Sequence, residues 1–239
     1  MADLAKGPVP AEGATGHGGP AVVEAPSRTV RILAISDEVD ERLYSPSVTR
    51  RYGPVDLILS CGDLPDYYLD YIASMLNAPL YLVRGNHDGR PRGEEADPHR
   101  GWGLVELHGT VVREHGLLIG GLDGCLRYNR GPYQYTEGQM REQVARMIPR
   151  LLANKVRYGR YLDVFVTHAS PRGIHDQPDR CHQGFEVFRW FLRTFRPRYH
   201  LHGHIHVYDN RTPTETRYED TLVLNAYRCR QLSVPVVGR

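Results

Sequence analysis

The sequence contains few cysteines, almost no lysine and no long apolar run, and each shortage excludes a class of protein. The four cysteines among 239 residues are far apart and form no Cys-x-x-Cys pair, which argues against a zinc ribbon and a disulfide scaffold. No window approaches the roughly 18 apolar residues of a membrane span, and residues 1–27 lack the apolar core of a secretory signal. We therefore expect reduced thiols and a cytoplasmic location.

The charge of the chain is nearly balanced. The formal net charge is +2, which gives no electrostatic argument for a nucleic-acid or membrane partner. Of the 30 basic residues only Lys6 and Lys155 are lysine, so the other 28 are arginine. Because these arginines are spread along the whole chain, a GC-rich genome explains them better than phosphate binding does. The 12 histidines are different, since four of them lie within residues 200–206.

The first 27 residues differ in composition from the rest of the chain. They are mostly Ala, Gly and Pro with scattered charges, which predicts a flexible tail without a core. From residue 28 onward, short apolar segments follow one another with no internal repeat and no second linker. We therefore predict a single folded domain over residues 28–239.

Apolar segments of strand length alternate with segments of helical periodicity. We expect strands at 30–36, 55–60, 80–83, 161–167 and 199–202, a strand pair at 104–114 and 117–121, and further strands at 217–225 and 227–237. We expect helices at 66–77, 135–157 and 185–195, with a kink or break at Pro149. This order favours the α/β class, with parallel βαβ units covered on both faces.

Polar side chains follow five of the predicted strands. They are all Asp, Asn or His: Asp37, Asp63, Asn86, His87, Asp88, His168, His204 and His206. Each one alone is more typical of a turn, a helix cap or a solvated side chain. Because the carboxyl ends of parallel strands meet in one crevice, their joint occurrence predicts a shared site. Oxygen and nitrogen donors without cysteine suit a divalent ion such as Mn, Fe or Zn.

Four short motifs occur in order at these strand ends. They are GD at 62–63, GNHD at 85–88, TH at 167–168 and GHIH at 203–206. Together they resemble the motifs of the calcineurin-like metallophosphoesterase superfamily, over a stretch from about residue 28 to residue 225. The resemblance implies a four-layer α/β/β/α sandwich with mixed sheets, which agrees with the predicted order of strands and helices.

The resemblance also implies a role for each of the matching residues. Six would bind one or two metal ions: Asp37, Asp63, Asn86, His168, His204 and His206. Asp63 would bridge two ions. One site would be completed by Asn86, His168 and His204, and the other by Asp37 and His206. His87 would face the substrate phosphate as a catalytic imidazole, and Asp88 would hold it.

One position departs from the motif of the superfamily. Its first motif is usually Asp-x-His, and here Val39 stands where the histidine would be. Residues i and i+2 of a strand point the same way, so Val39 leaves a ligand position empty. Water could fill it, or Glu38 or Asp40 could turn inward, and we favour water. The expected result is a weaker first metal site that prefers Mn.

These residues predict metal-dependent hydrolysis of a phosphate ester. We expect metal-bound hydroxide to attack phosphorus while His87 assists the leaving group. Residues 168–184 resemble small phosphodiesterase-like members of the superfamily, so a diester is favoured over a monoester. The expected partner is a small phosphate ester, and the sequence does not indicate an oligomeric state.

Other polar residues are weaker candidates for substrate contacts: Arg84, Arg127, Arg172, His175 and Asp176. A surface ion pair or an ordinary loop contact is the competing interpretation for each of them. The tyrosine-rich segment 127–135 is equally typical of a lid over a nucleobase and of a packed loop.

A second hypothesis belongs to a different class of function. The chain could be a metal-binding or degenerate-site scaffold that mediates protein interactions with the same fold. Val39 supports this hypothesis, whereas His87, Asp88 and the complete second ligand set oppose it. Nuclease or repair activity lacks support because the chain has little net charge and no accessory domain.

Overall fold

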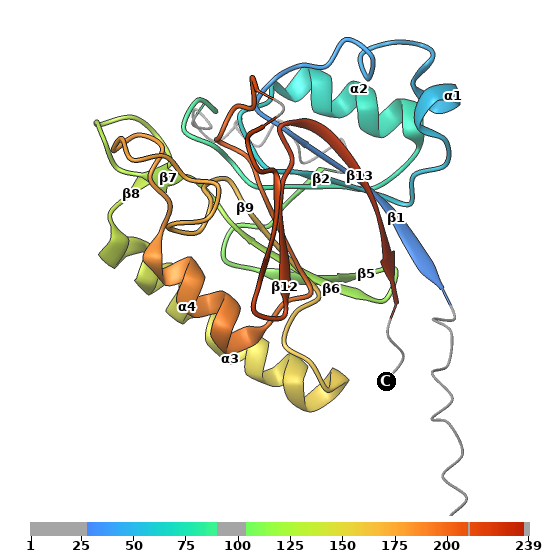
Figure 1. Cartoon of the computed structure of the whole chain (residues 1–239). Helices are drawn as coiled ribbons and strands as arrows, with labels where there is room; N and C mark the ends of the chain where they lie inside the picture. The colour runs from blue at the N-terminus through green and yellow to red at the C-terminus, as the bar shows by residue number, and fades with distance from the viewer. Residues whose placement is uncertain (1–27, 90–103, 210, 237–239) are drawn as a thin grey trace, which may run out of the picture.

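Two β-sheets face each other in the computed structural model, which describes residues 28–89, 104–209 and 211–236 (Figure 1). The first sheet has the order β13-β1-β2-β3-β4. Its strands are β1 (Thr29–Ser36), β2 (Leu57–Ser60), β3 (Leu80–Leu82), β4 (Leu104–Glu106) and β13 (Arg228–Pro235). Strands β1 to β4 are parallel, and β13 pairs with β1 in the antiparallel direction.

The second sheet has the order β11-β12-β10-β9-β6-β5. Its strands are β5 (Val111–Glu114), β6 (Leu117–Leu122), β9 (Val164–Thr167), β10 (Tyr199–His202), β11 (Glu215–Tyr218) and β12 (Thr221–Asn225). The four inner strands are parallel, and both outer strands are antiparallel to their neighbours. A short parallel ladder joins β7 (Cys125–Leu126) to β8 (Gln134–Tyr135) beside this sheet.

Helices cover the outer face of each sheet (Figure 1). On the first sheet lie α1 (Val48–Tyr52) and α2 (Asp66–Leu76), and on the second lie α3 (Glu137–Tyr158) and α4 (Glu186–Phe195). Helix α3 begins with a capping box, in which Thr136 and Gln139 satisfy each other's backbone amides. No helix of the described part is both long and apolar enough to cross a membrane.

Three separate apolar clusters show that the molecule has four layers. Neighbouring strand residues point to opposite sides, so Leu33 packs under α1 and α2 while Ile32 packs between the two sheets. In the second sheet, Val166 lies between the sheets and Phe165 packs under α3 and α4. The predicted α/β/β/α sandwich with mixed sheets is therefore confirmed.

Some predicted boundaries are wrong. Segment 104–114 is two strands rather than one, because β4 pairs with β3 in the first sheet and β5 pairs with β6 in the second. Segment 217–225 is a hairpin that turns at Glu219, whose φ is 51°. Helix α3 runs through Pro149 without a break. The tail predicted at 1–27 lies outside the described residues, and the single domain stays a prediction.

Replacing Phe165 with Ala should lower the free energy of unfolding by about 3–5 kcal/mol, because the ring is fully buried and its loss leaves a cavity. The ring stacks on Phe191 with a centroid distance of 4.2 Å. Denaturant unfolding followed by circular dichroism measures the change. Val156→Ala, at a side chain 85% exposed on α3, should stay within about 0.5 kcal/mol of the original protein. Equal losses in the two variants would contradict the assignment of this core.

Candidate metal centre

Five strands end at the same edge of the sandwich, and each is followed by a residue of the candidate site. Strands β1, β2 and β3 of the first sheet lead into Asp37, Asp63 and Asn86, while β9 and β10 of the second lead into His168 and His204. Three of these residues have left-handed backbone, with φ of 67° at Asp37, 58° at Asp63 and 68° at His204. Such backbone costs about 1–3 kcal/mol at a residue other than glycine and is typical of functional sites.

The side chains of Asp63, His168 and His204 form a compact group. Each offers one metal-ligating atom, and these three atoms lie within 4.8 Å of one another. His168 is fully buried, and its Nε2 atom is 3.2 Å from Asp63 Oδ2 and 3.1 Å from Asn86 Oδ1. Asn86 therefore adds an amide oxygen to the same group.

Hydrogen bonds fix which atoms of the group carry lone pairs. His168 Nδ1 donates to the main-chain oxygen of Cys61 at 2.8 Å, which makes Nε2 the ring nitrogen directed at the group. Asn86 Nδ2 donates to the Tyr128 hydroxyl at 3.1 Å, so Oδ1 is the atom directed at His168. The lone pairs of a ring nitrogen, an amide oxygen and a carboxylate oxygen thus converge. A metal ion between them would satisfy all three, so these residues fit a metal ion.

His204 is oriented in the same manner. Its Nε2 atom donates to the main-chain oxygen of Cys181 at 2.7 Å, and the Nδ1 atom is left as the possible ligand. The backbone amide of His204 donates to Asp37 Oδ1 at 2.8 Å. A strand end from the second sheet is thereby attached to one from the first.

The ionisation of the group also favours a cation. Burial alone would lower the pKa of His168, but the nearby Asp63 carboxylate outweighs burial and raises it above the ordinary histidine value. Burial likewise opposes the ionisation of Asp63, and the attraction of His168 holds the pKa of that carboxyl below its usual range. The surroundings of the two side chains thus stabilise a positive charge between them.

Asp37 fits a metal ligand, but the other expected member of the first metal site does not join it. The Asp37 Oδ2 atom is buried and has no hydrogen-bond partner in the described part of the chain. Burial raises the pKa of this carboxyl. His206 is exposed, its Nδ1 atom contacts the Tyr208 hydroxyl at 2.7 Å, and its ring stacks on Tyr227. Asp37, Asp63 and His206 do not form a tight ligand group like that of Asp63, His168 and His204.

The residues around the missing histidine have other partners. Val39 packs against the apolar cluster between the first sheet and its helices. The Glu38 carboxylate accepts hydrogen bonds from Tyr227 and Arg228, and the Asp40 carboxylate pairs with Arg42. Neither carboxylate therefore stands in for the imidazole. A water ligand at this position stays a prediction.

The GNHD motif forms a loop that is tied to Asp63. The backbone amide of His87 donates to Asp63 Oδ1 at 2.8 Å, and the His87 side chain is exposed at the edge of the site. Asp88 Oδ2 accepts from the amides of Gly85 and Asp63 at 2.7 and 3.0 Å. The described hydrogen bonds of Asp88 thus hold two loops together, and none of them reaches the His87 imidazole. Burial raises the pKa of Asp88 to about 6.

The predicted arginine contacts are engaged with other groups of the protein. Arg84 is buried, and its guanidinium pairs with Asp66 and Glu106, each at 3.0 Å. Arg127 donates to the main-chain oxygen of Gln134 and to the side chain of Gln139. Each arginine therefore stabilises the structure near the site, and its contact with substrate stays a prediction.

The three candidates on the loop after β9 lie in internal contacts as well. Arg172 Nε is 3.8 Å from Asp176 Oδ2, and this carboxylate accepts from the amides of Gly173 and Gly184. The two ring nitrogens of His175 contact His202 and Thr216, each at 2.9 Å. None of the three belongs to the group around His168.

Sequence reasoning missed the groups that orient the ligands. Tyr128 and the main-chain oxygens of Cys61 and Cys181 fix Asn86, His168 and His204. A backbone carbonyl has no signature in the residue type, and Tyr128 is one of 15 tyrosines. Only the three-dimensional contacts reveal them.

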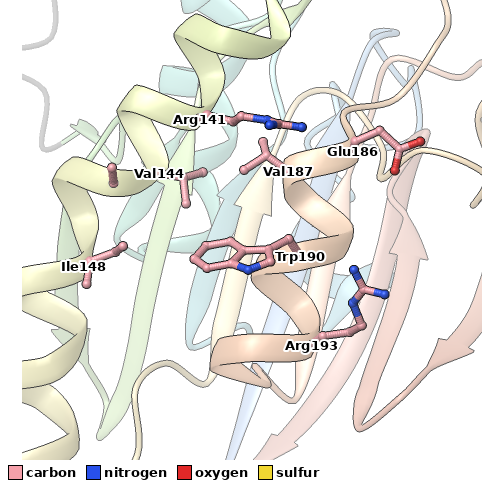
Figure 2. A pocket seen from close by; sticks show the side chains of 8 residues that line it. Arg141, Val144, Ile148, Glu186, Val187, Trp190 and Arg193 are labelled. Carbon is pink, nitrogen blue, oxygen red and sulfur yellow. The ribbon is translucent and has the colours of Figure 1, made fainter.

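A pocket between the two helices of the second sheet lies apart from this chemistry. It has a volume of about 460 Å³ and is lined by residues of α3 and α4, with Trp190 extending from α4 toward Val144 and Ile148 of α3 (Figure 2). It includes none of the predicted site residues.

The chain resembles known proteins in sequence and in fold. A family model of the calcineurin-like phosphoesterases matches residues 30–208. The crystal structure of TT1561 of Thermus thermophilus resembles the chain with a TM-score of 0.58 at 14% identity, over 88% of this chain and 100% of that one. The structure of Vacuolar Protein Sorting 29 from Cryptosporidium parvum has a TM-score of 0.41 at 14% identity, over 83% of this chain and 74% of that one. No curated protein matches. At these identities the structural matches show the fold alone.

Replacing Gly85 with Ala should weaken binding of Mn²⁺ at least about tenfold, as changes beside metal ligands commonly do. A Cβ atom at Gly85 would lie 2.1 Å from Asp63 Oδ1 and 2.6 Å from His168 Cε1, so both side chains must shift. Gly89→Ala is the matched control, because its Cβ atom would have nothing within 4 Å. Isothermal titration calorimetry measures both affinities, and equal affinities would contradict this site.

The buried carboxyl of Asp123 should give the metal-free protein a stability that depends on pH. Burial raises its pKa to about 7, whereas an unfolded chain has a value near 4. The folded state therefore binds the proton more tightly, and the free energy of unfolding should fall as the pH rises from about 4 to 7. Asp123→Asn should reduce this slope in denaturant unfolding. Asp220→Asn, at an exposed turn, should keep it; equal slopes in the two variants would contradict the prediction.

Proposed function

The chain belongs to the calcineurin-like phosphoesterase family, and we propose that it hydrolyses a phosphodiester with the help of divalent metal ions. The observation that carries this proposal is the convergence of lone pairs from Asp63, Asn86 and His168 on one point beside His204. The substrate is a small phosphate ester that reaches the edge where the strands end.

The metal ions are held by the residues that converge there. Asp63, Asn86, His168 and His204 form one site, and Asp37 with its buried Oδ2 atom supplies part of the neighbouring one. When bound, such ions neutralise charge on the phosphoryl oxygens and activate water as a nucleophile. The nitrogen and oxygen donors suit Mn, Fe or Zn, and we favour Mn because carboxylate and water dominate the incomplete site.

His87 is the side chain placed to handle a proton. Its backbone amide is anchored on Asp63, while its imidazole is exposed beside the ligand group. In this position it donates a proton to the leaving oxygen or stabilises charge on the phosphoryl group. Asp88 contributes by holding the loop of His87 against Asp63 through two backbone amides.

The charge around the site supports a diester substrate. A diester carries one negative charge, whereas a monoester carries nearly two at neutral pH. Arg84 pairs with Asp66 and Glu106, and Arg172 lies near Asp176, so both are partly neutralised by acidic groups. Two of the three candidate arginines thus have compensated charges, which favours the less charged ester, while the printed hydrogen bonds of Arg127 go to neutral groups. Action on such a metabolite is consistent with the cytoplasmic location that we propose.

The competing proposal is a metal-binding scaffold without turnover. The packing of Val39 in an apolar cluster and the contacts of His206 with Tyr208 and Tyr227 favour it, because they leave the first metal site incomplete. The complete ligand group around His168 and the exposed His87 favour the enzyme.

Hydrolysis of bis-p-nitrophenyl phosphate and p-nitrophenyl phosphate with added Mn²⁺ distinguishes the two proposals. We expect faster turnover of the diester, and a loss of about 10²–10⁴-fold in kcat for His87→Ala with unchanged metal content, because this variant removes only the proton donor. His168→Ala should lose both the metal and the activity. Absorbance of p-nitrophenolate and elemental analysis supply the two measurements.

The matched control is His115→Asn, in the turn between β5 and β6 at the opposite end of the strands. It should retain both activity and metal. A protein that binds metal at the His168 site but hydrolyses neither ester would favour the scaffold. Equal turnover in His87→Ala and the original protein would remove the proposed role of that imidazole.

A further inference from the structure

Three potential metal ligands outside the group around Asp63 lie together on the loop before α4. Asp179, Cys181 and His182 each offer one ligand atom, and these atoms lie within 4.8 Å of one another. We propose that the three residues form a separate metal site that is selective for zinc. This site goes beyond the proposed hydrolysis and does not depend on it.

The donor atoms of the two sites differ in chemistry. The group around His168 contains only nitrogen and oxygen donors, whereas the loop site adds the sulfur atom of Cys181. Thiolate sulfur combined with imidazole and carboxylate is a ligand set typical of zinc. Three protein ligands leave one of the four positions of a tetrahedral ion open for water.

The loop is held in shape without a metal ion. Asp179 Oδ1 accepts from the amides of Cys181 and His182, and both carboxylate oxygens are 3.0 Å from His182 Nδ1. At the base of the loop, Asp176 accepts from the amides of Gly173 and Gly184. Because the ligands are already close together, binding an ion would cost little conformational entropy.

Solvent has access to this site. The side chains of Asp179 and His182 are 52% and 38% exposed, and Cys181 is half-buried. An ion can therefore enter and exchange without opening the core.

Cys181 also connects the loop to the group around His168. Its main-chain oxygen accepts from His204 Nε2 at 2.7 Å. The rings of His182 and His204 are 5.3 Å apart. Zinc on the loop would fix the residue that orients His204, so the loop ion would stabilise the neighbouring site.

Cobalt serves as the spectroscopic probe for this zinc site. Metal-free full-length protein, kept reduced, is titrated with Co²⁺, because a cobalt–thiolate bond gives a charge-transfer absorption that nitrogen and oxygen ligands do not give. We expect this absorption in the original protein and in His168→Ala, and its loss in Cys181→Ser. Cys229→Ser is the matched control, because this half-buried thiol lies beside Asp40 and Tyr52 and away from the loop. The cobalt–thiolate absorption of this variant should equal that of the original protein.

Zinc binding gives the second measurement. Equilibrium dialysis should show one fewer Zn²⁺ bound to Cys181→Ser than to the original protein, and His182→Gln should weaken zinc binding at least about tenfold. Circular dichroism checks the fold, and His182→Gln carries the test if Cys181→Ser fails to fold. Absence of the cobalt–thiolate absorption, or its persistence in Cys181→Ser, overturns the loop site. Failure of the proposed hydrolysis would appear instead as missing turnover, whatever the cobalt absorption shows.

Discussion

The contact between His168 and Asp63 joins the two sheets of the sandwich, and the geometry of the site depends on it. Asp63 follows β2 of the first sheet, while His168 follows β9 of the second. The Cys61 carbonyl, at the end of β2, holds the other side of the same imidazole at 2.8 Å. One buried ring therefore contacts the first sheet through both nitrogens. The apolar cluster between the sheets sets their separation, and that separation determines whether these polar atoms meet.

The same edge concentrates unfavourable backbone and like charges. Asp37, Asp63 and His204 have left-handed backbone, and three carboxylates, those of Asp37, Asp63 and Asp88, lie among buried groups. The left-handed backbone and the buried carboxylates of Asp37 and Asp88 do not stabilise a metal-free protein. A bound cation would compensate for both costs. Its positive charge offsets the carboxylates, and its coordination by Asp37, Asp63 and His204 holds the strained turns in place. The arrangement is thus better explained by ion binding than by folding stability.

The sequence predicted parallel strands covered on both faces, with polar residues at their ends, because both follow from local patterns, whereas the four layers were implied by the resemblance to the phosphoesterases. The nearly continuous apolar run 30–36 is typical of a strand buried on both faces, with Ile32 and Leu33 on opposite sides, and the turn after each strand presents the next polar residue at the edge. Contacts between distant segments could not be predicted. Arg84 meets Asp66 and Glu106 only in the folded chain, and the split of 104–114 between two sheets depends on pairing partners that no single segment specifies.

The orientation of His204 bears on whether the two proposed metal sites act independently. The loop reaches His204 through the main-chain oxygen of Cys181, and not through its sulfur. A change of the Cys181 side chain can therefore leave that hydrogen bond in place and alter only the donor set of the loop. The backbone carbonyl of Cys181 orients His204, whereas the Cys181 thiol would determine which metal ion the loop prefers. Because these functions are on different atoms of one residue, the chemistry of the loop can vary without removing the ligand geometry at Asp63 and His168.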